Sequence, residues 1–314
     1  MKPNTYSIAI HGGAGTILKS AMTSEKEEAY NSALKMALQA GESILKQKGS
    51  AIDAVSAAII ELENCPLFNA GKGAVFTHTH MHELDASIMR GDNLMAGAVA
   101  GVRNIKNPIQ LARMVMEKSE HVLLGGQGAA DFAKTVNVEL APDSYFYSEE
   151  RHQQWLKAVK EDRITMDHDD MPSPDKKFGT VGAVARDIYG NLAAGTSTGG
   201  MTNKKFGRIG DSPVIGAGTY ANNLQCAVSC TGHGEYFIKA VVAYDVFCLM
   251  EYKQHSLEEA CRIVVKDKLV KLGGEGGLIA VDKFGNMSLC FNSEGMYRAS
   301  SGSDKELYIG IYAD

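Results

Sequence analysis

Glycine is the feature of this 314-residue sequence that most constrains its fold. The chain contains 33 glycines, and many of them occur in adjacent pairs. Glycine weakens the interior of helices and strands, but it permits sharp turns and close approach of two backbones. The pattern therefore predicts a fold with tight strand connections and closely apposed backbone segments. The pairs are Gly12-Gly13, Gly125-Gly126, Gly199-Gly200, Gly273-Gly274 and Gly276-Gly277.

Hydrophobic periodicity predicts several strands and at least two helices in each half of the chain. Strands are expected at residues 6–11, 73–77, 84–89, 94–102, 180–186, 192–197, 214–220, 227–229, 278–282, 287–291 and 307–312. Helices are expected at residues 24–49, 51–62, 108–118, 129–135, 149–161, 235–252 and 256–272. Runs of strands beside pairs of helices favour an α+β fold of stacked sheets covered by helices over a strictly alternating parallel fold.

The composition excludes several classes of protein. Hydrophobic residues make up 45% of the chain and charged residues 22%, which is typical of a globular protein and not of a disordered one. The net charge of −5 provides no basic surface for nucleic acid. Charges interrupt the apolar stretches, so no membrane span is expected. The first residues lack the apolar core of a signal peptide and the six cysteines are scattered, so we expect a cytoplasmic protein with reduced thiols.

The character of the sequence changes abruptly near its middle. Residues 161–178 are rich in acids and contain two prolines, and we expect them to form a mobile surface linker. Directly after them, Gly179 and Thr180 open an apolar strand. A cut between these two residues would give Thr180 a free α-amine with a pKa of about 8 beside its own hydroxyl. Such a residue is nucleophile and base together. The plainer interpretation is that Thr180 is an ordinary β-branched strand residue.

Three further segments supply groups that this chemistry needs. Thr198 places a second hydroxyl at the end of the neighbouring strand. Arg208 and Asp211 lie three residues apart in a glycine-containing loop and suit the carboxylate and the ammonium of a zwitterion, although a solvated ion pair is the alternative. The Thr231 hydroxyl and the Gly232 N–H lie at a strand-to-helix junction, where they form either an oxyanion hole or a simple helix cap.

A histidine-rich segment offers a different chemistry. His78, His80 and His82 alternate along the chain, so an extended strand would present all three imidazoles on one face. Three imidazoles are sufficient to hold a transition metal. The alternative is an exposed hairpin that happens to be rich in histidine.

A serine-hydrolase motif is also present. Residues 195–199 read Gly-Thr-Ser-Thr-Gly, which matches a nucleophile elbow centred on Ser197. Asp211 and His233 follow in the order of a catalytic triad. An elbow opens directly into a helix, however, and no helical apolar stripe follows here, which argues against a serine triad.

Together, these motifs resemble the plant-type L-asparaginase and isoaspartyl-peptidase family, a branch of the N-terminal nucleophile hydrolases. The similarity covers almost the whole chain, which makes it far more specific than one short pattern. The matching segments are residues 11–15, 69–73, 82–86, 179–182, 196–200, 207–213 and 295–298.

The resemblance implies a four-layer αββα sandwich built from one domain, residues 1–314. It implies self-cleavage between Gly179 and Thr180 into an α subunit, residues 1–179, and a β subunit, residues 180–314. Two cleaved protomers would then form a homodimer, which is a heterotetramer of chains. No cofactor is implied for catalysis.

The resemblance also assigns roles to individual residues. Thr180 would be the nucleophile, with Thr198 and Asn69 beside it and Thr231 and Gly232 as oxyanion donors. The residues implied to hold the substrate are Arg208, Asp211 and Gly234, with His233 next to them. Residues 11–13 would bear on cleavage. A structural sodium ion would bind the backbone carbonyls of Leu62, Glu63, Cys65, Phe68, Ala70 and Lys72.

The expected function is an amidohydrolase that releases L-aspartate from β-aspartyl dipeptides and from L-asparagine. Three alternatives stay open at the level of the sequence. They are a glycosylasparaginase-type amidase of the same superfamily, a serine hydrolase that uses Ser197, and a non-enzymatic aspartate-binding protein.

Overall fold

The computed structural model describes residues 5–161 and 179–313, and it contains two β-sheets stacked face to face. The expected linker at 161–178 lies outside the described residues, apart from Glu161. In spatial order, the larger sheet contains β12 (Lys305–Tyr312), β11 (Gly295–Gly302), β1 (Ser7–Gly15), β5 (Val181–Arg186), β6 (Leu192–Thr198), β2 (Leu84–Arg90), β3 (Ala96–Val102) and β4 (Leu123–Gly125). The smaller sheet contains β10 (Met287–Phe291), β9 (Gly276–Asp282), β8 (Cys226–Gly232) and β7 (Thr219–Ala221).

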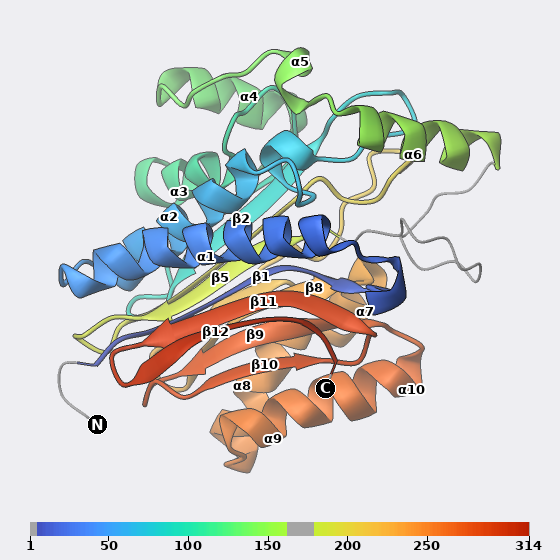
Figure 1. Ribbon diagram of the computed structural model, residues 1–314. Helices are drawn as coiled ribbons and strands as arrows, with labels where there is room; N and C mark the ends of the chain where they lie inside the picture. Colours follow the sequence, from blue (N-terminus) through green and yellow to red (C-terminus); the bar gives the residue numbers. More distant parts are fainter. Residues whose placement is uncertain (1–4, 162–178, 314) are drawn as a thin grey trace.

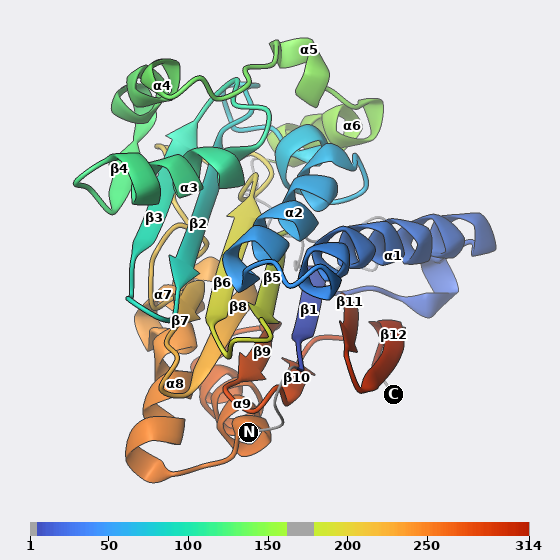
Figure 2. The same ribbon diagram turned by 90° about the vertical axis from the view of Figure 1, so that its left-hand side faces the viewer.

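Helices cover the outer faces of both sheets, as Figures 1 and 2 show. The larger sheet is covered by α1 (Ser24–Lys46), α2 (Ala51–Asn64) and α3 (Pro108–Lys118). The smaller sheet is covered by α7 (Gly234–Ala240), α8 (Val242–Lys253), α9 (Leu257–Arg262), a π-helical turn (Ile263–Leu269) and α10 (Val270–Leu272). The remaining helices are α4 (Gly126–Thr135), α5 (Asp143–Phe146) and α6 (Glu149–Lys160), with short 3₁₀ turns at Lys19–Ala21 and Gly71–Gly73. The architecture is the expected αββα sandwich.

The alternation of residues along β5 decides which side chains face the site. Val181 and Ala183 pack into the core beneath α1 and α2, whereas Val184 packs between the two sheets. Successive side chains of a strand point to opposite faces. Gly182, and Thr180 two residues before it, therefore lie on the side that faces the smaller sheet.

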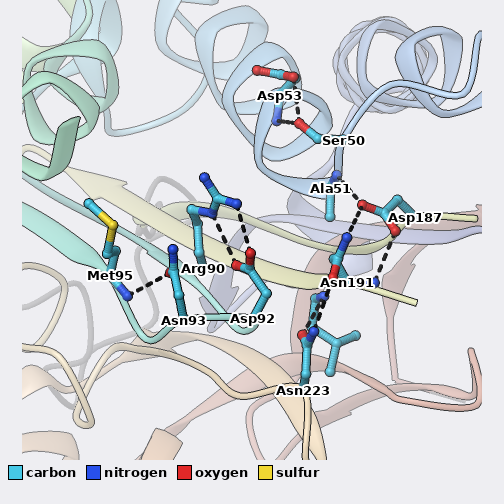
Figure 3. Close-up of polar contacts among 11 residues, drawn as sticks. Ser50, Ala51, Asp53, Arg90, Asp92, Asn93, Met95, Asp187, Asn191 and Asn223 are labelled. Atoms are coloured by element: carbon cyan, nitrogen blue, oxygen red, sulfur yellow. Dashed lines mark hydrogen bonds and ion pairs between the residues drawn. The ribbon is translucent and has the colours of Figure 1, made fainter. Parts of the chain in front are cut away.

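The turn that joins β5 to β6 has the hairpin form expected from the sequence (Figure 3). The Asp187 carboxylate accepts hydrogen bonds from the backbone N–H groups of Tyr189 and Asn191, both at 2.9 Å, which is the usual way an aspartate closes a turn. Its second oxygen accepts from the Ala51 N–H at 3.2 Å, at the start of α2. The turn thus ties the hairpin to the helix that covers it.

Several expected elements differ from the structure. The strand expected at 73–77 is absent. The Val75 N–H donates a hydrogen bond to the Asn69 side chain at 3.0 Å instead of to a neighbouring strand, and a turn follows. The strand expected at 214–220 shrinks to β7, because residues 211–218 form successive turns. The single helix expected at 235–252 is divided into α7 and α8 at Val241, whose φ of +50° is left-handed. β11 was not expected at all, and β1 continues four residues beyond its expected end.

None of the helices in the described part of the chain combines the length and the apolar character needed to cross a bilayer.

Candidate active site

Thr180 lies immediately before β5, near the middle of the larger sheet, and its side chain is buried. Its Oγ1 donates a hydrogen bond to Oγ1 of Thr198 at 3.2 Å. Thr198 in turn donates to the carbonyl oxygen of Gly179 at 2.8 Å. The two hydroxyls and the peptide between Gly179 and Thr180 therefore form one hydrogen-bonded unit, and the structure brings these three sequence-predicted residues together.

Asn69 brings the first half of the chain to the same point. Its Nδ2 donates to the carbonyl oxygen of Gly200 at 2.7 Å, and its backbone carbonyl accepts from the Gly199 N–H at 3.0 Å. A Cβ added to Gly179 would lie only 1.6 Å from the Cβ of Asn69. Glycine is required at position 179 because the Asn69 side chain occupies the space that a Cβ would need.

His11 contacts the backbone carbonyl group of Thr180. Its Nδ1 lies 3.0 Å from the carbonyl oxygen of Thr180, and its Nε2 lies 3.0 Å from Oγ of Ser229 on β8. Burial lowers the pKa of His11 to about 3, so the imidazole is neutral at physiological pH. The bulge that follows His11 in β1 is compatible only with a small residue, since a Cβ on Gly12 would lie 2.3 Å from the Phe68 ring.

Thr231 and Gly232 end β8 of the smaller sheet, opposite β1 of the larger sheet. The Thr231 Oγ1 accepts a hydrogen bond from the Ala14 N–H of β1 at 3.3 Å, which joins the two sheets beside the site. Gly232 has a φ of +145°, a conformation that favours glycine, and a Cβ there would lie 2.5 Å from the Glu275 carbonyl oxygen. The chain then enters α7 at Gly234.

Gly234 is the point at which the predicted substrate-binding residues meet. A Cβ on Gly234 would lie 2.8 Å from Nη2 of Arg208 and 3.0 Å from Oδ1 of Asp211. The structure therefore brings these three residues together, although they come from a loop and from the start of a helix.

The sequence left open a solvated ion pair between Arg208 and Asp211. The two residues do not form one in the structure. The guanidinium of Arg208 instead forms two hydrogen bonds with the Glu235 carboxylate, each 2.9 Å long. Asp211 is buried, and its Oδ2 has no hydrogen-bond partner in the described part of the structure. Burial raises the pKa of Asp211 to about 7, and the charge of Arg208 limits the increase.

His233 lies beside the ion pair of Arg208 and Glu235. Its Nε2 is 3.4 Å from the Glu235 carboxylate, and its ring packs edge-on against Tyr236.

The serine-triad alternative is wrong. Ser197 points to the opposite face of β6 from Thr198, where its Oγ donates to the buried carboxyl group of Glu63 on α2 at 2.6 Å. Neither Asp211 nor His233 contacts Ser197. Asp211 lies against Gly234 at the start of α7, and His233 lies beside Glu235 of the same helix.

The histidine segment does not form a metal site. Residues 77–81 form a turn instead of a strand, so the alternation does not place the three imidazoles on one strand face. His78 bonds the Asn203 side chain, His80 stacks on Phe76 at 4.6 Å between ring centroids, and His82 bonds the Val75 carbonyl. Across the described ranges, no cluster of three His, Cys, Asp or Glu side chains is arranged to hold a metal.

In the predicted sodium loop, residues 62–72, three backbone carbonyls lie close to the glycines at its end. A Cβ on Gly71 would lie 2.5 Å from the Glu63 carbonyl oxygen, and a Cβ on Gly73 would lie 2.1 Å and 2.7 Å from those of Phe68 and Pro66. Closely spaced carbonyl oxygens suit a hard cation. The sodium site at the six predicted carbonyls stays a prediction.

Two contacts of the site were not found from the sequence. Glu235 is the partner of Arg208, and Ser229 links His11 to the smaller sheet. Neither contact leaves a spacing signal, because each joins residues from separate elements. Glu235 is recognisable in the sequence only as an acid in the first turn of a helix.

The chain is similar to known proteins along almost its whole length. The chain matches the family model described as asparaginase over residues 4–311. It is 53% identical to isoaspartyl peptidase of Escherichia coli over 308 residues, with coverage of 98% of this chain and 96% of that protein. It is 42% identical to isoaspartyl peptidase/L-asparaginase of Homo sapiens, with the same coverage, and 42% identical to probable isoaspartyl peptidase/L-asparaginase 2 of Arabidopsis thaliana, with coverage of 98% and 99%.

Two stacked sheets between helical layers, with a threonine at the start of a central strand, define the class of N-terminal nucleophile hydrolases. Within this class, the chain belongs to the asparaginase family.

Proposed function

We propose that this protein is an N-terminal threonine amidohydrolase that releases L-aspartate from β-aspartyl dipeptides and from L-asparagine. The observation that carries the proposal is the hydrogen-bonded unit of Thr180, Thr198 and the Gly179 carbonyl. The relative from Escherichia coli is an isoaspartyl peptidase and that from Homo sapiens an isoaspartyl peptidase/L-asparaginase, which supports the same substrates.

The first step is self-cleavage. The Thr180 hydroxyl attacks the carbonyl carbon of Gly179, and the hydrogen bond from Thr198 to the Gly179 oxygen stabilises the negative charge that develops there. The peptide C–N bond breaks, the nitrogen takes the hydroxyl proton, and an ester joins Gly179 to the Thr180 oxygen. Water then hydrolyses the ester, which yields a carboxylate at Gly179 and a free hydroxyl and α-amine at Thr180. The products are subunits 1–179 and 180–314.

In the mature enzyme, the Thr180 α-amine accepts the hydroxyl proton while the oxygen attacks the side-chain carbonyl carbon of the substrate. The Thr231 hydroxyl and the Gly232 N–H stabilise the resulting oxyanion. The C–N bond of the substrate breaks and the amine leaves with a proton from Thr180. Water then hydrolyses the acyl-enzyme, which releases L-aspartate and restores Thr180.

Substrate orientation comes from two charged groups. Arg208 binds the α-carboxylate of the aspartyl unit and Asp211 binds its α-ammonium, with Gly234 leaving room between them. The site itself needs no cofactor. A sodium ion held by the carbonyls of residues 62–72 would stabilise the loop that carries Asn69.

The proposal includes a cytoplasmic homodimer of cleaved protomers. The scattered cysteines support the location. Light scattering of the purified protein tests the oligomeric state, and cell fractionation tests the location.

The central experiment incubates the purified protein with L-asparagine, a β-aspartyl dipeptide and a glycosylated asparagine, and measures the aspartate released. A denaturing gel with N-terminal sequencing accompanies each time point. We expect a fragment that begins Thr-Val-Gly-Ala and hydrolysis of the first two substrates. Activity on glycosylated asparagine alone would favour a glycosylasparaginase, and L-aspartate binding by a single uncut band without turnover would favour a binding protein.

A further inference from the structure

The pairing of Arg208 with Glu235 has a consequence for substrate binding. Glu235 lies on α7, whereas Arg208 lies in a loop that contains Gly207, with a φ of +65°, and Gly210. Glycines on both sides leave the loop free to adopt many conformations. The two hydrogen bonds from the Arg208 side chain in the structure both go to Glu235. Helix α7 therefore holds the Arg208 guanidinium through contacts that lie outside the loop of Arg208.

A second carboxylate competes for the same guanidinium. Asp211 comes from the same loop and lies close enough for both its Oδ1 and the Arg208 Nη2 to reach within about 3 Å of one point above Gly234. Its Oδ2 is buried and has no hydrogen-bond partner among the described residues. Without Glu235, the guanidinium would turn toward this buried charge, because a buried, unpaired carboxylate is costly.

We propose that Glu235 is a positioning residue that keeps Arg208 apart from Asp211, so that both remain available to bind a zwitterionic aspartyl substrate. The inference rests on the proposed function, because Arg208 and Asp211 bind the two α-groups there. If the two residues paired with each other, each would neutralise the group that the substrate needs. Glu235 occupies one edge of the planar guanidinium and leaves another edge for the substrate carboxylate.

The test compares Glu235→Ala and Glu235→Gln in the fully cleaved enzyme. Glu235→Ala is expected to raise KM for a β-aspartyl dipeptide by about tenfold or more and to change kcat by less than about threefold, because the loss is one of ground-state binding. Glu235→Gln retains an oxygen that accepts from Arg208 and is expected to restore KM to within about threefold of the wild type.

The chain contains a matched control. Glu259 and Arg262 on α9 form an equally bidentate pair, with both hydrogen bonds at 3.0 Å, on an exposed surface. Glu259→Ala removes a carboxylate from a pair of the same kind, and we expect KM and kcat to stay at the wild-type values.

The pH profile supplies a second readout, in which Glu235→Ala is compared with Glu235→Gln because both changes remove the Glu235 charge. The charged groups that face Asp211 are Arg208, Glu235 and Asp85. Loss of the Glu235 charge by itself lowers the pKa of Asp211 in both variants. Pairing with Arg208 in Glu235→Ala would lower this pKa further, so its acid limb of kcat/KM would lie about one unit or more below that of Glu235→Gln. The same limb in both variants, together with an unchanged KM in Glu235→Ala, would overturn the inference.

Calorimetric binding of L-aspartate separates this inference from the proposed function. If the wild type binds L-aspartate without hydrolysing either substrate, and Glu235→Ala weakens that binding about tenfold while Glu235→Gln does not, the function is wrong and the positioning role stands. If the wild type hydrolyses its substrates and Glu235→Ala binds and turns them over normally, the positioning role is wrong. Absence of both binding and hydrolysis in the wild type would overturn both.

Discussion

The two ends of the β5–β6 hairpin show how one ladder of hydrogen bonds serves two purposes. At the turn end, the Asp187 carboxylate accepts from Asn191 and Ala51 (Figure 3). It also accepts from the Tyr189 N–H. The Asn223 side chain adds a hydrogen bond to Leu192 at 2.8 Å. These contacts satisfy backbone N–H groups of the turn and of the start of α2, and they contribute to stability.

At the open end, Thr180 and Thr198 form a single hydroxyl chain to the Gly179 carbonyl. Glycines surround them, and the Asp211 oxygen nearby has no partner in the described part of the structure. The comparison shows that the polar groups at the turn end have hydrogen-bond partners, whereas the open end keeps polar groups available for a reaction. Substitutions at the two ends should therefore separate activity from stability.

The largest effect is expected from Thr180→Ala. The change removes the nucleophile of both reactions, so the chain should remain a single band and kcat should fall by about 10⁴-fold or more. A gel and an aspartate-release assay measure the two outcomes. Retained hydrolysis would contradict the mechanism.

Gly179→Ala should have the next largest effect. Its Cβ would lie 1.6 Å from that of Asn69, so the peptide must move, and we expect self-cleavage to slow by about 100-fold. Gly128→Ala in α4 is the control, because nothing lies within 4 Å of its new methyl group. A time course on denaturing gels measures both rates, and equal rates would show that the contact is unimportant.

Asp211 should make activity depend on pH. Its pKa is raised to about 7 by burial, and only the ionised form attracts the substrate ammonium. We expect kcat/KM to fall as pH decreases below about 7, by about tenfold per unit once the residue is protonated. Asp211→Asn should bind substrate weakly at every pH and lose this limb, which steady-state kinetics from pH 5 to 9 will test.

The same shift has a consequence for stability. A carboxyl group whose pKa is raised by folding stabilises the protein below its unfolded pKa and loses that contribution as pH rises through about 7. The thermal midpoint of the wild type should therefore drop between pH 5 and pH 8 by more than that of Asp211→Asn. An identical decrease in both proteins would contradict the assignment.

The smallest effect on activity is expected at the turn end. Asp187→Ala removes the acceptor of three backbone N–H groups, of which that of Ala51 is buried, so it should lower the thermal midpoint by about 5 °C or more and change kcat/KM by less than about twofold. Asp92→Ala, in the neighbouring turn of Figure 3, removes only a partly exposed ion pair with Arg90 and should shift the midpoint by about 2 °C or less. Differential scanning calorimetry compares the two.

The sequence predicted most of the fold where local signals were strong. Residues 108–118 form α3 as expected, because Pro108 begins a helix with a regular apolar stripe. β11 was missed because its buried residues include Arg298, Ser300 and Ser301, which read as a loop. Arg298 is tolerated there because its guanidinium donates to the Tyr312 carbonyl and to the Tyr308 hydroxyl, partners that only the folded sheet provides.

The break at Val241 shows the same limitation. Nothing local marks it, since the sequence offers no glycine where the backbone becomes left-handed. The N–H groups of Ala243 and Tyr244 just after it bond to the carbonyls of Ala217 and Gly216, so tertiary contacts hold this conformation.

By itself, the sequence determined the family, the layered fold and the residues that gather around Thr180, because short motifs and hydrophobic periodicity are local properties of a chain. Only the tertiary structure decided which charges are partners. Arg208 and Asp211 are neighbours along the chain, yet Arg208 pairs with Glu235 of α7 and Asp211 is left buried. Such choices depend on the distances and burial that arise when separate segments pack together, and no spacing within one segment encodes them.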